Sequence, residues 1–185
     1  MVRPGMVGLI AELRRRTDTS ENQTVINGVS YWSDDQLQTV LDQHGDFYET
    51  RLSPRPVVQN GVLVYKRFLI PELVPAFIEA DTHSVVNERG EPVSDYEIVT
   101  RQVLFTVSQP SPALYIRCVA FDMVGATAQI WLEKAGHRAA LINWKAGTQT
   151  LNEDQEYKHC IEQYNLWAKS RVYTRTLTRS GYYGQ

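Results

Sequence analysis

The stretch YWSDDQLQTVLDQH (residues 31–44) is the clearest helix signal in the chain. The Ser33 hydroxyl can accept a hydrogen bond from the backbone N–H of Gln36, and the Gln36 side chain can accept one from the backbone N–H of Ser33. This is the capping box that begins many helices. Two aspartates follow Ser33 and place negative charge where the helix dipole favours it. Four residues share one face of the expected helix: Leu37, Val40, Leu41 and His44. The pattern predicts a short packing helix, ended by Gly45, that contains no catalytic residue set.

Length and composition predict one globular domain. The chain has 185 residues, of which 43% are hydrophobic and 22% charged. This length supports a hydrophobic core without disulfides or structural metals. The net charge of -2 argues against nucleic-acid binding by the whole domain. No signal peptide begins the chain and no run approaches the ~18 apolar residues of a membrane span. We therefore expect synthesis in a reducing cytoplasm and no membrane partner.

Three further helices are expected outside residues 31–44. Residues 5–16 carry an apolar stripe of Met6, Leu9, Ile10 and Leu13, and residues 17–30 follow as a loop. Ser111 and Pro112 can begin a long helix over 112–135 that is apolar on most sides. Thr150 and Glu153 form a second candidate capping box, for a helix that ends near residue 170. Between these last two helices, residues 136–146 receive no assignment, although Trp144 could dock them to the core.

Short strands are expected between residues 46 and 108. Runs rich in β-branched and aromatic residues alternate there with turn signals such as Asn60-Gly61 and the ERGEP turn, in which Gly90 takes a positive φ. The runs are Phe47–Leu52, Val62–Leu69, Phe77–Ala80, Ser84–Asn87, Tyr96–Thr100 and Gln102–Val107. The fold class is therefore α+β: a bundle of about four helices (5–45 and 111–170) with an inserted small antiparallel β-sheet (46–108) and an extended C-terminal tail.

The tail, Lys169–Gln185, has no acidic residue. Its basic and aromatic residues are Lys169, Arg171, Tyr173, Arg175, Arg179, Tyr182 and Tyr183. Two interpretations stay open: a frayed terminus, or an arm over 171–185 that becomes ordered on a partner.

No catalytic, metal-binding or cofactor-binding motif is present. His44, His83, His137 and His159 are scattered over different expected elements, which favours surface or helix-end roles. Cys118 and Cys160 fall on expected apolar helix faces and are predicted to be buried free thiols. The carboxylates Asp34, Asp35 and Asp42 are better explained by helix capping and solubility than by a catalytic pair. The prediction is a protein that is not an enzyme; the enzymatic alternative would gather Glu79, Asp81 and His83 in the strand-rich insert.

One motif is more specific than the rest. Trp32-Ser33-Asp34-Asp35-Gln36-Leu37 with Leu41-Asp42 matches W/F-[ST]-D-[DE]-[EQ]-L-x-x-x-L-D, and the segment VLFTVSQPSPALYIRCVAFDMVGATAQIWL runs from the insert into a helix rich in small residues. With this order of elements, residues 6–170 resemble the head-to-tail connector (adaptor, or head-completion) proteins of tailed double-stranded DNA bacteriophages. The large β insert departs from the smallest, all-helical members.

The resemblance implies a structural virion protein at the head–tail interface. Such adaptors form a ring, commonly a dodecamer, on the portal of the head; a stopper or tail-completion protein binds the other side, and viral DNA passes through the lumen. Because family members often attach to the portal through their C-terminal segment, the seven basic and aromatic tail residues named above become candidate portal-binding residues. The alternative function is a small nucleic-acid-binding protein that uses the basic, tyrosine-bearing tail.

Overall fold

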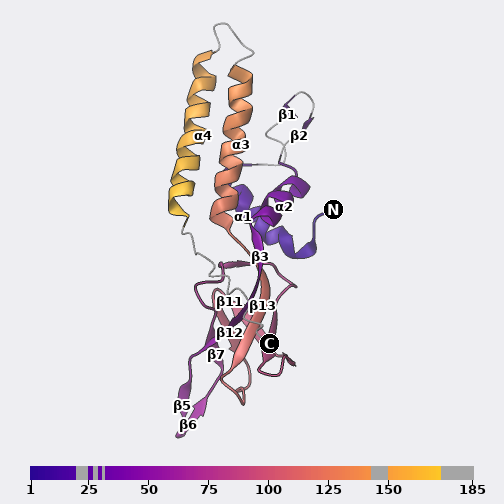
Figure 1. The fold of residues 1–185 in the computed structure, drawn as a ribbon, viewed down its shortest axis with the longest axis vertical. Coiled ribbons are helices and arrows are strands. Elements are labelled where there is room, and N and C mark those ends of the chain that lie inside the picture. The colour runs from indigo at the N-terminus through magenta and orange to yellow at the C-terminus, as the bar shows by residue number, and fades with distance from the viewer. Residues whose placement is uncertain (20–24, 27–28, 31, 143–149, 172–185) are drawn as a thin grey trace, which may run out of the picture.

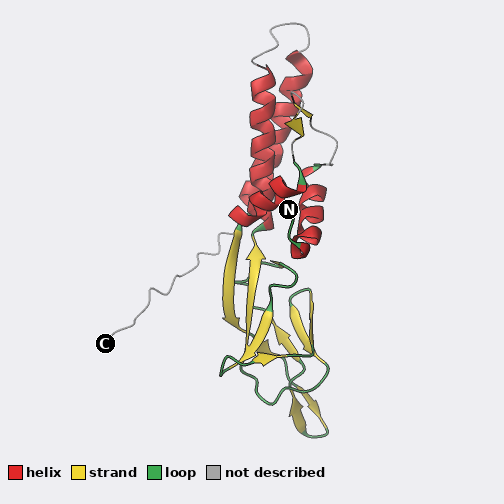
Figure 2. Cartoon of the chain, turned by 90° about the vertical axis from the view of Figure 1, so that its right-hand side faces the viewer, coloured by secondary structure: helices red, strands yellow, loops and turns green. Residues whose placement is uncertain are grey.

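The computed structural model describes residues 1–19, 25–26, 29–30, 32–142 and 150–171. In this part of the chain, four α-helices and the short β1–β2 pair lie at one end of an elongated molecule, and the other antiparallel sheets lie at the opposite end (Figures 1 and 2). The predicted α+β class is confirmed. No helix in the described ranges is long and apolar enough to cross a bilayer.

The helical end is built as its apolar stripes predict. A short 3₁₀ turn, η1 (Pro4–Met6), leads into α1 (Val7–Thr17), which packs with α2 (Asp34–Gln43) against the start of α3 (Met123–Ile142). Their shared core comprises Met6, Leu9, Ile10, Leu13, Trp32, Leu37, Val40, Leu41, Phe121, Met123, Ala126 and Ile130. The helix α4 (Thr150–Ser170) runs beside α3 (Figure 1). The side chains of the candidate Thr150–Glu153 cap, and Trp144, lie outside the described residues.

The capping box of α2 is confirmed. The Gln36 N–H donates to Ser33 Oγ at 3.4 Å, and the Ser33 N–H donates to Gln36 Oε1 at 2.8 Å. Gly45 follows the helix, as expected, but it begins the strand β3 (Gly45–Arg51) and adopts no positive φ. A Cβ at this position would lie 2.6 Å from the Phe121 ring, so close strand packing requires the glycine.

The predicted long helix over 112–135 is wrong in its first half. Leu114–Phe121 is the strand β13, and the helix begins only at Met123. The reason is visible in the alternation of this segment: Leu114, Ile116, Cys118 and Ala120 are buried on one face, while the residues between them are half-buried on the other. Cys118 therefore lies on a strand, although it and Cys160 are both buried free thiols as predicted. The Ser111 hydroxyl accepts the Ala113 N–H in a loop, not at a helix start.

The strand β13 is the centre of the larger sheet. It pairs along its length with β3, from Tyr115↔Arg51 to Phe121↔Gly45, and on its other side with β8 (Phe77–Ile78) and β9 (Ser84–Asn87), followed by β10 (Pro92–Val93). The strand-rich region therefore runs from Gly45 to Phe121 and exceeds the expected 46–108. Because β3 continues α2 and β13 leads into α3, this pair joins the two ends of the molecule.

A second sheet faces the first. Its strand order is β11 (Tyr96–Val99), β12 (Gln102–Phe105), β7 (Arg67–Leu69) and β4 (Ser53–Pro54). The two sheets enclose a core of Leu52, Phe68, Ile70, Val74, Val85, Val103, Phe105, Leu114, Ile116, Cys118 and Ala120.

Two small hairpins complete the described strands. The predicted run Val62–Leu69 divides into β7 and β6 (Val62–Val64), which pairs with β5 (Val57–Gln59) through a turn with Asn60 and Gly61 at φ 52° and 77°. Gly90 also takes the expected positive φ, of 77°. Where a loop was expected over 17–30, β1 (Val25–Ile26) pairs with β2 (Val29–Ser30).

Candidate functional site

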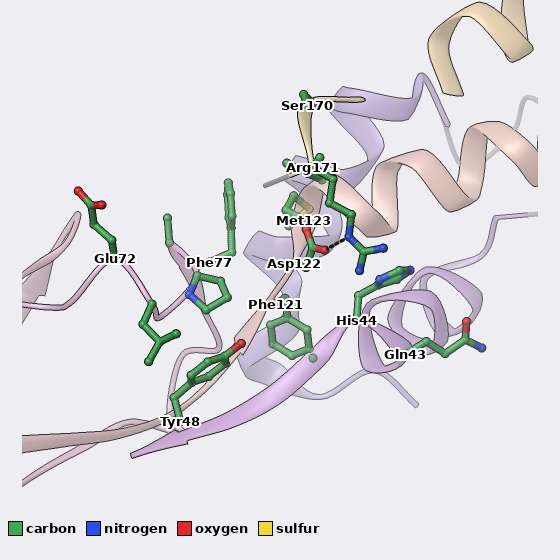
Figure 3. A pocket seen from close by; sticks show the side chains of 15 residues that line it. Gln43, His44, Tyr48, Glu72, Phe77, Phe121, Asp122, Met123, Ser170 and Arg171 are labelled. Carbon is green, nitrogen blue, oxygen red and sulfur yellow. Dashed lines mark hydrogen bonds and ion pairs between the residues drawn. The ribbon is translucent and has the colours of Figure 1, made fainter. Parts of the chain in front are cut away.

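A pocket in the described part of the chain lies where the helical end meets the sheets. It has a volume of about 490 Å³ and is bounded by the end of α2, the start of β3, the loop before β8, the β13–α3 joint and the end of α4 (Figure 3). Its residues come from four separate parts of the sequence: Gln43, His44, Gly45 and Tyr48; Glu72, Leu73 and Pro75–Phe77; Phe121–Val124; and Ser170 and Arg171. The pocket is therefore a junction between segments that only the tertiary fold brings together.

Asp122 organises this junction. Its Oδ1 accepts the N–H of Gly125 at 2.9 Å, which caps the start of α3, and its backbone N–H donates to the carbonyl of His44 at 2.9 Å. Its Oδ2 accepts a hydrogen bond from Arg171 Nε at 2.6 Å (Figure 3). One side chain thus fixes the beginning of α3 and the residue after α4, and its backbone holds the end of α2.

Gly125 permits this close approach. A Cβ there would lie 2.6 Å from Asp122 Oδ2, 2.9 Å from His44 Nδ1 and 3.1 Å from Arg171 Cζ. Distances below 3.0 Å between a Cβ and other heavy atoms require displacement. The position therefore accepts only glycine without rearrangement of the groups around Asp122.

A hydrogen-bond network extends from the pocket wall along α3. His44 Nε2 lies 2.7 Å from Gln129 Oε1, and Gln129 Nε2 donates to Gln43 Oε1 at 2.8 Å and to Glu133 Oε1 at 2.9 Å. With the amide oxygen assigned as acceptor, His44 carries its proton on Nε2. His44 is thus a helix-end residue, as predicted, and it orients α2 against α3.

The structure places two of the seven candidate portal-binding residues. Lys169 is exposed on the last turn of α4, whereas Arg171 is half-buried against Asp122 at the pocket rim. The other five, Tyr173, Arg175, Arg179, Tyr182 and Tyr183, lie outside the described residues. Arg171 therefore belongs to the packed body.

The three residues of the enzymatic alternative have different surroundings. Glu79 is buried and accepts a hydrogen bond from Arg3 Nε at 2.8 Å, and the same guanidinium binds Asp42 at 2.6 Å. Asp81 is exposed at φ 67°, and the His83 ring packs against Tyr96 with centroids 5.9 Å apart. The Arg3 bridge joins the N-terminus to α2 and to the segment after β8, which is a structural arrangement.

The remaining histidines and the cysteines lie in packing environments. His137 and His159 meet Trp32 and Trp131 edge-on, with ring centroids 6.1 Å and 5.7 Å apart. Burial raises the pKa of Cys118 to about 11 and also raises the pKa of Cys160, which keeps both as thiols near neutral pH. Within the described ranges, no three His, Cys, Asp or Glu side chains gather as metal ligands would.

The sequence indicated that Gly125 allows close approach of a neighbour, but it did not reveal Asp122 as a cap, because that residue fell inside a presumed continuous helix. The available signal was an aspartate three residues before Gly125, at the point where strand alternation gives way to helical spacing. Comparison of the chain with protein-family models, with curated proteins and with solved structures gives no match.

Proposed function

We propose that the chain is a connector subunit of a tailed bacteriophage, which forms a ring on the portal of the head. The ring joins the portal to a stopper or tail-completion protein and lets viral DNA pass through its lumen, at the head–tail interface of the virion. The observation that carries the proposal is the Trp32–Asp42 motif within the order of elements described above.

The local structure of this motif supports a scaffold role. Trp32 is 4% exposed, and Leu37 and Leu41 are fully buried. Asp34 binds Arg14 at 2.7 Å, and Asp42 binds Arg3 at 2.6 Å. The motif positions therefore hold α2 to α1 and to the N-terminus, a packing role without chemistry that fits a structural subunit.

Surface composition also supports assembly. Four large aliphatic side chains of the β5–β6 hairpin are more than half exposed. A cyclic ring needs two different contact surfaces on each subunit, one for each neighbour. Exposed apolar patches often mark such contacts.

The proposal is tested by electron microscopy of the protein mixed with portal protein from the same phage. We expect a ring on one face of the portal, with subunits in register with the portal. Deletion of residues 172–185 is expected to abolish docking and leave the folding transition in place, since Arg171 and its partner Asp122 remain. A truncated chain that still decorates portals would overturn the role of the arm.

The alternative, nucleic-acid binding through the tail, predicts a different result. Full-length protein would shift random DNA at low salt, the shift would weaken steeply as salt rises, and the 172–185 deletion would remove it. Portal docking without a shift of the DNA would favour portal binding over nucleic-acid binding as the function of the tail.

A further inference from the structure

The β5–β6 hairpin has exposed apolar strands and basic residues where it joins the sheet. The segment RLSPRPVVQNGVLVYKR (51–67) contains four basic residues and no acidic one. The ladder pairs Val57 with Val64, Val58 with Leu63 and Gln59 with Val62, so each face carries aliphatic side chains. Val58 and Leu63 are 66% and 53% exposed. We use "hairpin" below for residues 55–66.

The hairpin leaves the molecule without support from other strands. Below it, Arg55 and Lys66 still join the second sheet, because the Arg55 N–H donates to the Arg67 carbonyl and the Phe105 N–H donates to the Lys66 carbonyl, each at 2.8 Å. Beyond this point, β5 and β6 pair only with each other among the described strands and project from the end of the molecule (Figure 1). A solitary two-stranded hairpin is marginal in water. An apolar one is therefore expected to be covered in the working assembly.

The opposite edge of the same sheet has complementary properties. The hairpin extends from the β4–β7 side, whereas β11 forms the other edge and pairs only with β12 among the described strands. Asp95 and Glu97 place exposed carboxylates at the start of β11, and the preceding turn between β9 and β10, which belongs to the larger sheet, adds Glu88 and Glu91 beside one basic residue, Arg89. These side chains make no ion pair within the described part of the chain. We call this surface the acidic edge.

The acidic edge also has room for apolar side chains. A hollow of about 340 Å³ lies over the start of β11 and the end of β12, lined by Asp95–Glu97 and Leu104–Thr106. Leu104 lies directly across the ladder from Glu97, so the two share a face, and Val99 on the same strand is 43% exposed. The edge backbone of β11 can accept another strand.

We propose that the hairpin of one copy packs on the acidic edge of a second copy, with Arg55 and Lys66 against Glu88 and Glu97. The tail of the same chain is a poor occupant for the hairpin, because residues 169–185 are basic like the hairpin base. The hairpin leaves one edge of the second sheet, whereas the acidic edge combines the opposite edge strand, β11, with the neighbouring β9–β10 turn of the larger sheet. The contact therefore joins two different surfaces, so it is heterologous and can close a ring. The inference rests on the proposed function only in that the chain assembles with itself.

Charge reversal tests the pairing. Arg55→Glu/Lys66→Glu and Glu88→Lys/Glu97→Lys are each expected to weaken self-association about tenfold at low salt, measured by sedimentation velocity. Asp95 is left unchanged because its φ of 62° disfavours other side chains. The two variants mixed together, or all four changes in one chain, should restore association, since every hairpin then meets an edge of opposite charge.

Cross-linking tests the geometry. Chains with Leu63→Cys are mixed with chains with Glu97→Cys and oxidised; the native cysteines, at 0% and 6% exposure, need not be removed. A disulfide dimer is expected only in the mixture. Leu166→Cys, at an apolar position of α4 that is 62% exposed, replaces Leu63→Cys as the matched control and should give no specific product.

Three results would overturn the inference. One is a Leu63→Cys chain that cross-links only to itself, which indicates a symmetric contact. Another is a wild-type chain that stays monomeric both alone and with portal. The third is that charge reversal in the hairpin abolishes DNA binding but leaves self-association unchanged. If a ring forms on the portal without hairpin-to-edge cross-links, the proposed hairpin contact is wrong and the connector proposal still holds. If the chain self-associates through the hairpin but does not dock to the portal, the hairpin contact holds and the connector proposal is wrong.

Discussion

Arg171 Nε donates a hydrogen bond over 2.6 Å to Oδ2 of Asp122, the carboxylate whose other oxygen caps α3. The residue after α4 is thus tied to the residue before α3. This closes the α3–α4 pair at the end nearest the sheets (Figure 1).

Substitutions at Asp122 and Arg171 should distinguish how much the helix cap and the ion pair each contribute to the free energy of unfolding. We expect Asp122→Ala to lower the free energy of unfolding by about 1–2 kcal/mol, because the helix loses its cap. Asp122→Asn keeps a capping oxygen and loses the charge, and Arg171→Ala leaves the cap intact. Since both side chains are about one-third exposed, we expect these two changes to cost only about 0.5 kcal/mol each. Urea denaturation measures all three, and an equal loss for Asp122→Asn and Asp122→Ala would contradict the capping role.

Gly125→Ala should destabilise the protein although alanine is the better helix former. The added methyl would overlap Asp122 and the His44 ring, which their hydrogen bonds hold in place. We expect a net loss of about 1–2 kcal/mol. Gly136→Ala, in the same helix with open space around the glycine, is the matched control and should gain about 0.5–1 kcal/mol. Thermal unfolding distinguishes the two, and a gain in both variants would show that the junction is loosely packed.

The elements that the sequence predicted well are those specified locally. The capping box of α2 needs only Ser33 and Gln36, three residues apart, and the stripes of α1 and α2 need only helical spacing. The segment Leu114–Phe121 is different, because its apolar residues fit both a two-residue and a helical period. What decides between them is pairing with Gly45–Arg51, more than sixty positions earlier, and the local alternation does not reveal that distant partner.

The candidate site was harder to predict for the same reason. Its pocket joins residues near positions 44, 75, 122 and 171, which no sequence spacing relates. The basic character of the tail was evident, yet the sequence could not show that Arg171 belongs to the body and Lys169 to the surface. The error at 112–121 also concealed Asp122 as a cap, since a residue in mid-helix has no capping role.

The stability of α1 should depend on pH through Glu12. Hydrogen bonds from Arg15 and Arg16 lower the pKa of Glu12 from 4.5 to about 2. Because the pKa of Glu12 is lower in the folded than in the unfolded state, the ionised side chain stabilises the fold at a pH above the unfolded-state pKa. This stabilisation is lost as the pH falls from 4.5 towards 2. We expect Glu12→Gln to lower the free energy of unfolding by about 0.5–1 kcal/mol at neutral pH. The difference between this variant and the wild type should become smaller as the pH falls through that acid range. Parallel urea titrations at several pH values measure the difference, and a constant deficit down to the lowest pH would contradict the assignment.

Cysteine labelling should report the strand β13 directly. Cys118 is fully buried between the two sheets, whereas Cys160 is 6% exposed in the smaller core between α3 and α4. Because burial raises the pKa of both thiols, reaction with an alkylating reagent near neutral pH requires opening of the structure. Opening of the α3–α4 pair exposes fewer apolar contacts than separation of the sheets, so we expect Cys160 to be labelled first and Cys118 only on global unfolding. Mass spectrometry of digested protein at increasing urea separates the two sites, with Cys160→Ala chains as the control that isolates Cys118. Labelling of Cys118 at the rate of Cys160 without denaturant would show that residues 114–121 lie outside the sheet core.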